Sequence, residues 1–312
     1  MLRSIFAYGL LCLVAAAAVI SGCSQAPPPT SEPTHSATYS EYAVACDHEI
    51  ASQAGALMLA QGGNAVDAAV AASFCLSVVR PFSCGIGGGG FMVISLPTST
   101  PGAARQAVAL DYREASPAAV GPDYFESLPE KSSELGIHAS AVPGTVAGLL
   151  YALENYGTLD RTTVLVPAIQ AAREGFAADA FHVKTVEDMA AAWHAYPHLR
   201  PQLLPAWDRF ARRGKIKPGD LIVNEPQARA LELIADQGAA AFYEGPIAQA
   251  ILEVMKEEGG PITQADLSAF AVRERPALES ETGPWRVLSM PPPSSGGIAI
   301  QQVFGLLDRF DG

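Results

Sequence analysis

The chain has 312 residues, of which 49% are hydrophobic and 17% are charged, and its formal net charge at pH 7 is −12. This is the composition of a globular protein, long enough for one large or two ordinary domains. Because the negative balance offers no basic surface to a polyanion, no binding of nucleic acid is expected.

The amino terminus is predicted to be an export signal. Arg3 gives a positive start, and the uncharged run from Ile5 to Ile20 is too short and wrongly flanked for a transmembrane helix. The run ends in Ile20-Ser21-Gly22-Cys23, which resembles a bacterial lipobox. Residues 1–22 are therefore predicted to be a lipoprotein signal peptide, and Cys23 the lipidated first residue of the mature protein. The alternative is an ordinary signal peptide in which Cys23 is incidental.

Residues 23–41 are predicted to be a tether. They are rich in Pro, Ser and Thr, and Pro27-Pro28-Pro29 favours extended backbone. Such a segment would connect a membrane to the folded part, residues 42–312. We therefore expect a lipid-anchored protein of the bacterial cell envelope, with its folded part outside the cytoplasm.

Once Cys12 is removed with the signal peptide and Cys23 is lipidated, three cysteines are left with a free side chain, namely Cys46, Cys75 and Cys84. An odd number leaves two possibilities open: one disulfide with one thiol, or three buried thiols. Cys84 lies beside a run of glycines, but a small buried cysteine is a commoner use of this residue than a nucleophile.

No metal site or other cofactor is predicted. No pair of cysteines has C-x-x-C spacing. His194 and His198 are four residues apart, but Pro197 between them disfavours the helix that would align them as ligands.

The folded part begins with a predicted strand, Tyr42–Cys46, and a helix, Glu49–Gln61. Asn64 and Asp67 are expected to cap a second helix over residues 65–79. Because this helix is apolar on every side after Asp67, we expect it in the middle of the protein.

The stretch from Cys84 to Ile94 contains five glycines in seven positions, and Gly85, Gly87 and Gly90 fit the G-x-G-x-x-G pattern of dinucleotide-binding loops. That loop requires a strand before the glycines and a helix after them. Here a helix precedes them and a strand follows, so no nucleotide site is predicted. The glycines are instead expected to allow sharp turns, positive φ angles and close approach of backbones.

The remaining chain is predicted to alternate a few strands with many helices. Strands Phe91–Leu96 and Gln106–Glu114, separated by Pro101-Gly102, are expected to form a hairpin or to lie side by side in one sheet. Further strands are predicted at Phe270–Arg275 and Trp285–Ser289. Helices are predicted at Pro143–Tyr156, Thr163–Glu174, Asp179–Tyr196, Glu225–Gln237, Pro246–Glu258 and Ile298–Phe310.

Seven segments occur in an order that resembles one enzyme family, the γ-glutamyltransferases, also called γ-glutamyl transpeptidases or glutathione hydrolases. They are QGGNAVDAAVA, GGGGFMVI, LDYREASP, PGTVAGLLYALENYG, FYEGPIAQAI, GGPITQADL and SMPPPSSGGIAI. The similarity covers nearly everything from Tyr42 onward. It implies an α+β fold, the αββα sandwich of the N-terminal nucleophile hydrolases, here incomplete because only the large-subunit portion is present.

The resemblance also implies an activity and a missing partner. The family's precursor cuts itself, and the new terminal threonine of the small subunit acts as nucleophile with its own amine as base. A γ-glutamyl group then passes from glutathione or a related amide to water or an amino group. The threonine would lie beyond residue 312, so no catalytic residue is assigned here and this chain alone is expected to be inactive. Thr162-Thr163 does not resemble the processing site.

One substrate-binding residue is implied by the resemblance. Arg113, in the family's Arg-Glu motif, is expected to grip the α-carboxylate of the γ-glutamyl donor, since a guanidinium can bind a carboxylate with two parallel hydrogen bonds. The alternative is an ion pair between Arg113 and Glu114 or another acid. Ser294 and Ser295 could present groups to a ligand or could only turn the chain, and the sequence leaves both open.

Two other functions stay open at this stage. One is a related amide acylase, such as a cephalosporin acylase or an enzyme that processes poly-γ-glutamate. The other is a non-catalytic binding protein of the envelope. Substrate size and acceptor would depend largely on residues outside this sequence.

Overall fold

A computed structural model describes residues 38–98 and 105–309. The chain divides into two units, Met1–Tyr42 and Ala43–Gly312. The predicted signal peptide, Cys23 and most of the predicted tether lie outside the described residues. Of the helices in the described part, none is long and apolar enough to cross a membrane.

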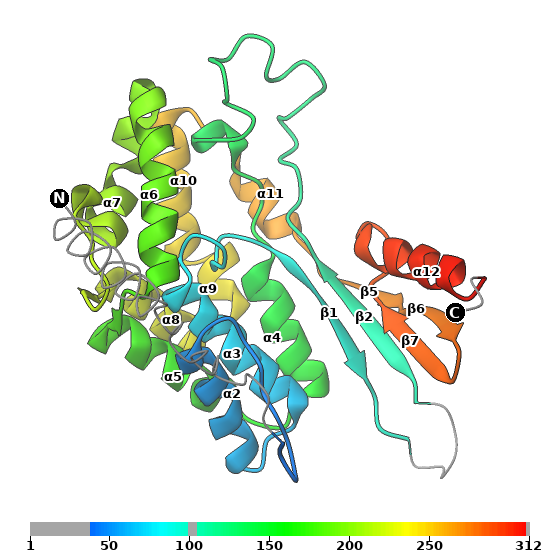
Figure 1. Cartoon of the computed structure of the whole chain (residues 1–312). Coiled ribbons are helices and arrows are strands. Elements are labelled where there is room, and N and C mark those ends of the chain that lie inside the picture. The colour runs from blue at the N-terminus through cyan, green and yellow to red at the C-terminus, as the bar shows by residue number, and fades with distance from the viewer. Residues whose placement is uncertain (1–37, 99–104, 310–312) are drawn as a thin grey trace, which may run out of the picture. The chain divides into compact units, whose positions relative to one another are not determined.

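The second unit is built around helix α3 (Ala65–Val79). It packs against both α2 (Glu49–Ala60) and α5 (Arg161–Glu174), and α5 continues the packing to α8 (Glu225–Gln237) (Figure 1). Eleven of the fifteen residues of α3 are buried. The prediction that this all-round apolar helix lies in the middle of the protein is confirmed.

A capping box begins α3, as predicted. The Asn64 side chain accepts from the backbone N–H groups of Val66 and Asp67, and the Asp67 carboxylate accepts from the N–H of Asn64. The same carboxylate accepts from the N–H groups of Thr158 and Leu159, in the loop between α4 (Thr145–Tyr156) and α5. Asp67 therefore joins the start of α3 to a segment about ninety residues further along the chain.

A three-stranded antiparallel sheet lies beside these helices. Its order is β1 (Gly90–Ser95), β2 (Ala107–Tyr112), β5 (Arg273–Pro276), with Gly90 opposite Tyr112 and Asp111 opposite Arg273. The predicted hairpin of β1 and β2 is thus confirmed. Helix α4 (Thr145–Tyr156) lies between α3 and this sheet and contacts both (Figure 1).

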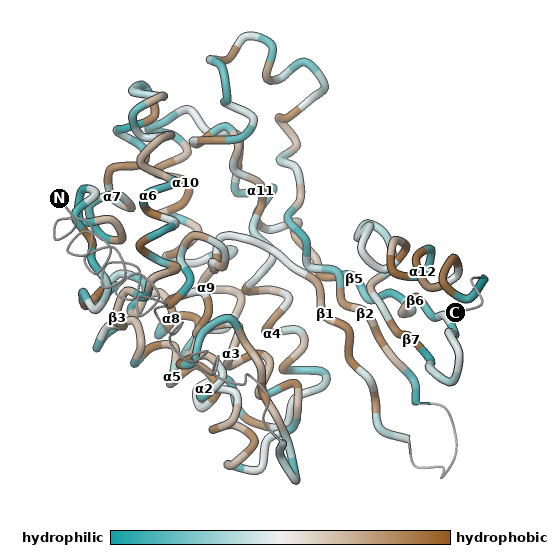
Figure 2. The backbone as a smooth tube through the Cα atoms, viewed as in Figure 1, coloured by the Kyte–Doolittle hydropathy of each residue, from teal (hydrophilic) through white to brown (hydrophobic). Residues whose placement is uncertain are grey.

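The other elements extend this arrangement. Strands β6 and β7 form a hairpin on which α12 packs, and β3 pairs with β4. Figure 2 shows hydrophobic residues along β1, β2 and α12. The bounds are β3 Phe176–Ala177, α6 Ala180–Ala195, α7 Arg200–Ala211, β4 Leu221–Ile222, α9 Ala239–Tyr243, α10 Pro246–Glu258, α11 Gln264–Ala269, β6 Leu278–Thr282, β7 Trp285–Ser289 and α12 Gly296–Leu307.

The predicted strand Tyr42–Cys46 is wrong, because no strand forms there. Val44 and Cys46 pack instead on helix α2. The N–H of Cys46 donates to Ser52 Oγ over 3.1 Å, and the side chain of Val44 lies so close to Gly55 that a Cβ on this glycine would be 2.8 Å from it. The β-branched Val44 here serves packing without a strand partner.

Helix α7 was not predicted, because Pro201 and Pro205 lie within it. Pro201 falls in the first turn, where a missing N–H costs nothing. The ring of Trp207 is buried and stacks on Trp193 of α6, with ring centroids 4.9 Å apart. Tertiary packing of this aromatic pair outweighs the breaker residues.

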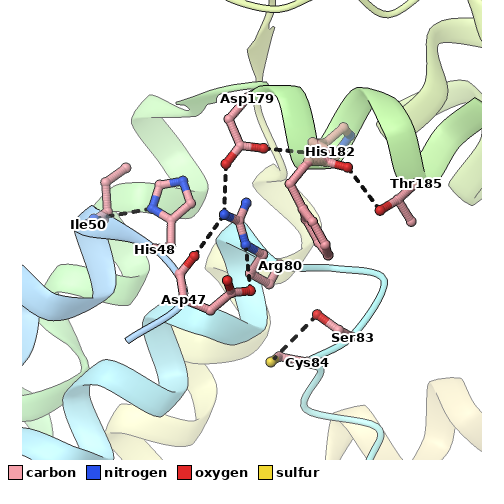
Figure 3. Close-up of polar contacts among 10 residues, drawn as sticks. Asp47, His48, Ile50, Arg80, Ser83, Cys84, Asp179, His182 and Thr185 are labelled. Carbon is pink, nitrogen blue, oxygen red and sulfur yellow. Dashed lines mark hydrogen bonds and ion pairs between the residues drawn. The ribbon is translucent and has the colours of Figure 1, made fainter. Parts of the chain in front are cut away.

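Arg80 ends α3 and fixes where the chain leaves it (Figure 3). Its side chain is only 7% exposed, and Nε and Nη2 form ion pairs with Asp47 at 3.0 Å and with Asp179 at 2.7 Å. Nη2 also donates to the Asp47 backbone carbonyl. Although burial raises the pKa of Asp179, its hydrogen bonds from Arg80 and from the His182 N–H lower that pKa below the usual value. The start of α2, the end of α3 and the start of α6 are therefore held together just before the glycine run.

Candidate functional site

The glycine run crosses the start of α4. The carbonyl oxygen of Gly88 accepts from the N–H groups of Gly144, at 2.7 Å, and Thr145, at 2.9 Å. A Cβ on Gly89 would lie 2.6 Å from the Glu114 nitrogen. The close approach predicted for these glycines is therefore confirmed. The expected positive φ angles are wrong, since the glycines from 85 to 90 have none.

Tyr112, at the end of β2, is enclosed by glycines. A Cβ on Gly144 would lie 2.0 Å from the Tyr112 carbonyl oxygen, and one on Gly148 would lie 2.0 Å from Tyr112 Cγ. Burial raises the pKa of Tyr112 to about 12. Since side chains alternate along a strand, Tyr112 facing α4 puts Asp111 and Arg113 on the opposite side.

Arg113 lies just past the end of β2 and is exposed. It lines a pocket of about 500 Å³ together with Asp111, Phe270, Arg273, Arg275 and others. A second pocket, of similar volume, borders Arg113 with Gly87, Glu114 and Ser140. Among the described residues the Arg113 guanidinium has no ion pair, and Glu114 turns toward Gly88 and Gly89 instead. The alternative of an Arg113–Glu114 ion pair is not realised here.

The backbone of Arg113 is positioned by Asp111. This buried carboxylate accepts from the Arg113 N–H at Oδ1, over 3.3 Å. Its Oδ2 accepts from both Nε and Nη2 of Arg275, at 3.0 and 2.8 Å. Because Arg275 neutralises Asp111, the carboxylate can hold the strand end without competing for the guanidinium of Arg113.

The segment from Met290 to Ser295 turns the chain between β7 and α12. Ser294 Oγ accepts from the N–H of Gly296, and Ser295 lies at the start of α12 without a side-chain cap bond. Of this segment, Pro293 lines the pocket of Arg113. The turning role left open by the sequence is therefore observed.

The three cysteines of the folded part are free thiols. Only Cys75 is buried; Cys46 and Cys84 are half-buried. Burial raises the pKa of the Cys75 thiol to about 12, and neighbouring Cys46 adds to the rise. A thiol so hard to ionise is a poor nucleophile.

The other polar residues considered from the sequence are placed as follows. Within residues 38–98 and 105–309, no group of three His, Cys, Asp or Glu side chains could hold a metal ion. His194 is in the last turn of α6, and His198 lies in the short helical turn after it. Thr162 and Thr163 lie in the first turn of α5, where their hydroxyl groups donate to the capping Asp160.

Sequence reasoning missed the rest of the pocket around Arg113. Asp111 lies on β2, whereas Arg273 and Arg275 lie on β5, and these strands are far apart in the sequence: Arg275 is 164 residues from Asp111. One signal was present: in Arg273-Glu274-Arg275, a period of two puts both arginines on one face of a strand.

Known proteins resemble this chain in sequence and in fold. A glutathione hydrolase proenzyme of Escherichia coli K12 is 36% identical, covering 96% of this chain and 52% of that protein. An acylase ACY 1 proenzyme of Pseudomonas sp. strain V22 is 34% identical, covering 88% and 49%. The crystal structure of Helicobacter pylori γ-glutamyltranspeptidase aligns with a TM-score of 0.79 at 34% identity, covering 88% of this chain and 77% of that one.

Both the fold and the family of the chain follow from these similarities. The chain has the αββα fold of the N-terminal nucleophile hydrolases in incomplete form, with helices packed on the β1–β2–β5 sheet. The family model described as gamma-glutamyltranspeptidase matches residues 51–312, and the chain belongs to this family. It spans about half the length of the curated relatives it matches.

Proposed function

We propose that this chain is the large-subunit portion of an exported γ-glutamyltransferase or glutathione hydrolase, and that Arg113 binds the α-carboxylate of its γ-glutamyl donor. The observation that carries the proposal is the exposed guanidinium of Arg113, which forms no ion pair within the described part of the chain and lines a pocket of about 500 Å³. A carboxylate is the ligand that matches this planar, permanently charged group.

The proposed reaction is acyl transfer. A threonine hydroxyl attacks the γ-carbonyl carbon, the amine of the donor leaves, and water or another amine then releases the glutamyl group from the ester. We place the threonine in the small subunit, which the roughly twofold longer relatives would include. Arg113 contributes by fixing the donor's α-carboxylate, so that the γ-carbonyl meets the nucleophile in one orientation.

The test compares the chain alone with the chain joined to the remaining half of a family member. We expect no release of nitroaniline from γ-glutamyl-p-nitroanilide by the chain alone, and release by the joined protein. In the joined protein, Arg113→Ala should lower kcat/KM by a factor on the order of tens to thousands, because a charge-assisted bidentate contact is lost. Arg113→Lys should recover only part, since an ammonium is a point charge.

A second candidate is an acylase of other amides, favoured by the similarity to the acylase ACY 1 proenzyme. Donor analogues separate the two. Turnover of a desamino analogue should still depend on Arg113, whereas turnover of an analogue without the α-carboxylate should not. If Arg113→Ala slows both analogues equally, Arg113 has only a structural role. If the joined protein binds γ-glutamyl compounds without turning them over, the non-catalytic envelope binder is the better reading.

A further inference from the structure

Besides Arg113, two arginines of β5 line the same pocket, Arg273 and Arg275. In the register of β2 and β5, Asp111 is opposite Arg273 and Leu110 is opposite Glu274. Glu274 accepts from the hydroxyl of Tyr156, a residue of α4. Because side chains alternate along β5, Arg273 points away from α4, toward the side that carries Asp111 and Arg113.

Arg273 and Arg275 have different surroundings although they share this face. Arg275 is half-buried and gives both Nε and Nη2 to Asp111. Arg273 is exposed, lines the same pocket, and has no ion pair or hydrogen bond from its side chain to any residue of the described part. Asp111, which lies directly opposite Arg273, is thus already neutralised by the diagonal neighbour.

The pocket is therefore lined by two guanidinium groups that have no acidic partner among residues 38–98 and 105–309, in a chain whose net charge is −12. Arg273 is opposite Asp111, and Arg113 follows Asp111 by two residues, so the two arginines are placed as diagonal neighbours. Diagonal neighbours on an antiparallel ladder are about 7–8 Å apart along the backbone. In γ-glutamylglycine the two carboxylates are at most about 9 Å apart when the chain between them is extended. Two carboxylates of one small γ-glutamyl compound can therefore reach both arginines.

We propose that Arg273 is a specificity residue that binds a second carboxylate, on the leaving-group side of the donor whose α-carboxylate Arg113 holds. The inference rests on the proposed function. The second carboxylate has two possible sources. It is next to the scissile amide in γ-glutamyl amino acids and in oligo-γ-glutamate, and one residue further away in a tripeptide such as glutathione.

The experiment measures glutamate release by the joined protein from two matched pairs of donors. The first pair is γ-glutamylglycine and γ-glutamylglycinamide; the second is S-methylglutathione and the same compound with its glycyl carboxylate as amide. In each pair only the second carboxylate differs. The readout is the ratio of kcat/KM for acid over amide, in the wild-type protein and in Arg273→Gln, Arg273→Lys and Arg229→Gln. Arg229 is an exposed arginine of α8 outside the pocket and controls for net charge.

We expect the acid to be preferred by about three- to tenfold in at least one pair, the range of a partly exposed charge pair. The ratio should fall toward one in Arg273→Gln, stay partly raised in Arg273→Lys, and be retained in Arg229→Gln. The pair that shows the effect identifies the source of the carboxylate. Equal turnover of acid and amide, or a ratio unaffected by Arg273→Gln, overturns the inference while Arg113-dependent turnover upholds the proposed function. No Arg113-dependent turnover of any donor overturns both.

Discussion

At the scale of single residues, a buried carboxylate fixes the backbone by accepting hydrogen bonds from its N–H groups. Asp67 is fully buried, and four donors satisfy its carboxylate: the N–H groups of Asn64, Thr158 and Leu159, and the Thr158 hydroxyl. Burial raises the pKa of Asp67, but these four hydrogen bonds together lower it below the usual value. The ionised form is therefore the one that stabilises the fold.

Asp67→Asn should destabilise the protein by about 2–4 kcal/mol at pH 7, because an amide NH₂ would face backbone donors. Since the pKa is lower in the folded state, this contribution is present above the unfolded-state pKa of about 4 and is lost as the pH falls through the folded-state pKa. Urea unfolding of both proteins between pH 7 and pH 3 measures the difference. Asp266→Asn, in the more exposed capping box of α11, is the control and should cost about 1 kcal/mol. A gap between wild type and Asp67→Asn that does not narrow at low pH would contradict the role of charge.

At the scale of elements, the contact of α4 with the sheet depends on the absence of side chains. Gly148 is inside a helix, where alanine is intrinsically favoured by about 1 kcal/mol. A Cβ there would lie 2.0 Å from Tyr112 Cγ, a distance that packed atoms cannot adopt. Overpacking costs about 1–3 kcal/mol or more, so the clash outweighs the propensity.

Gly148→Ala should therefore lower the melting temperature. Gly305→Ala, inside α12 with no atom within 4 Å of its Cβ position, should raise stability by up to about 1 kcal/mol. Thermal unfolding followed by circular dichroism compares the two substitutions, which differ only in surroundings. Because Tyr112 adjoins Arg113, Gly148→Ala should also lower kcat/KM in the joined protein more than Gly305→Ala does. Equal effects of the two substitutions would show that helix propensity, and not packing, decides.

The elements also show what sequence could and could not predict. Helices with strong periodicity and caps, such as α3 and α8, were predicted within two residues of their bounds, because local signals and burial agree there. Helix α7 was missed because two prolines argue against a helix that the buried Trp207 stabilises by stacking on Trp193. Arg113 was found through the family's motif. Arg273 was not, because its place in the pocket depends on the register of β2 and β5, which no local signal specifies.

At the scale of the whole molecule, the amino-terminal sequence predicts attachment to a membrane through a lipid. The segment from Arg3 to Cys23 reads as a lipoprotein signal, and the Pro-rich residues after it as a tether. A single acyl chain gives only weak binding to a membrane, whereas several chains on one residue anchor a protein stably. If Cys23 carries the lipid, membrane attachment should depend on this one side chain and not on the fold.

Cys23→Ser should therefore move the protein, expressed in a bacterial host, from the membrane fraction to a soluble fraction. Cys46→Ser is the matched control, since it removes a half-buried thiol of the folded part and should leave partitioning unchanged. Detergent-phase partitioning of both variants and the intact mass of the amino-terminal peptide measure the outcome. The wild-type peptide should begin at Cys23 and carry the added mass of acyl chains, and the peptide of Cys23→Ser should carry none. A wild-type protein that stays soluble, or a Cys23→Ser protein that still enters the detergent phase, would show that residues 20–23 are not a lipidation signal and that Cys23 is incidental to an ordinary signal peptide.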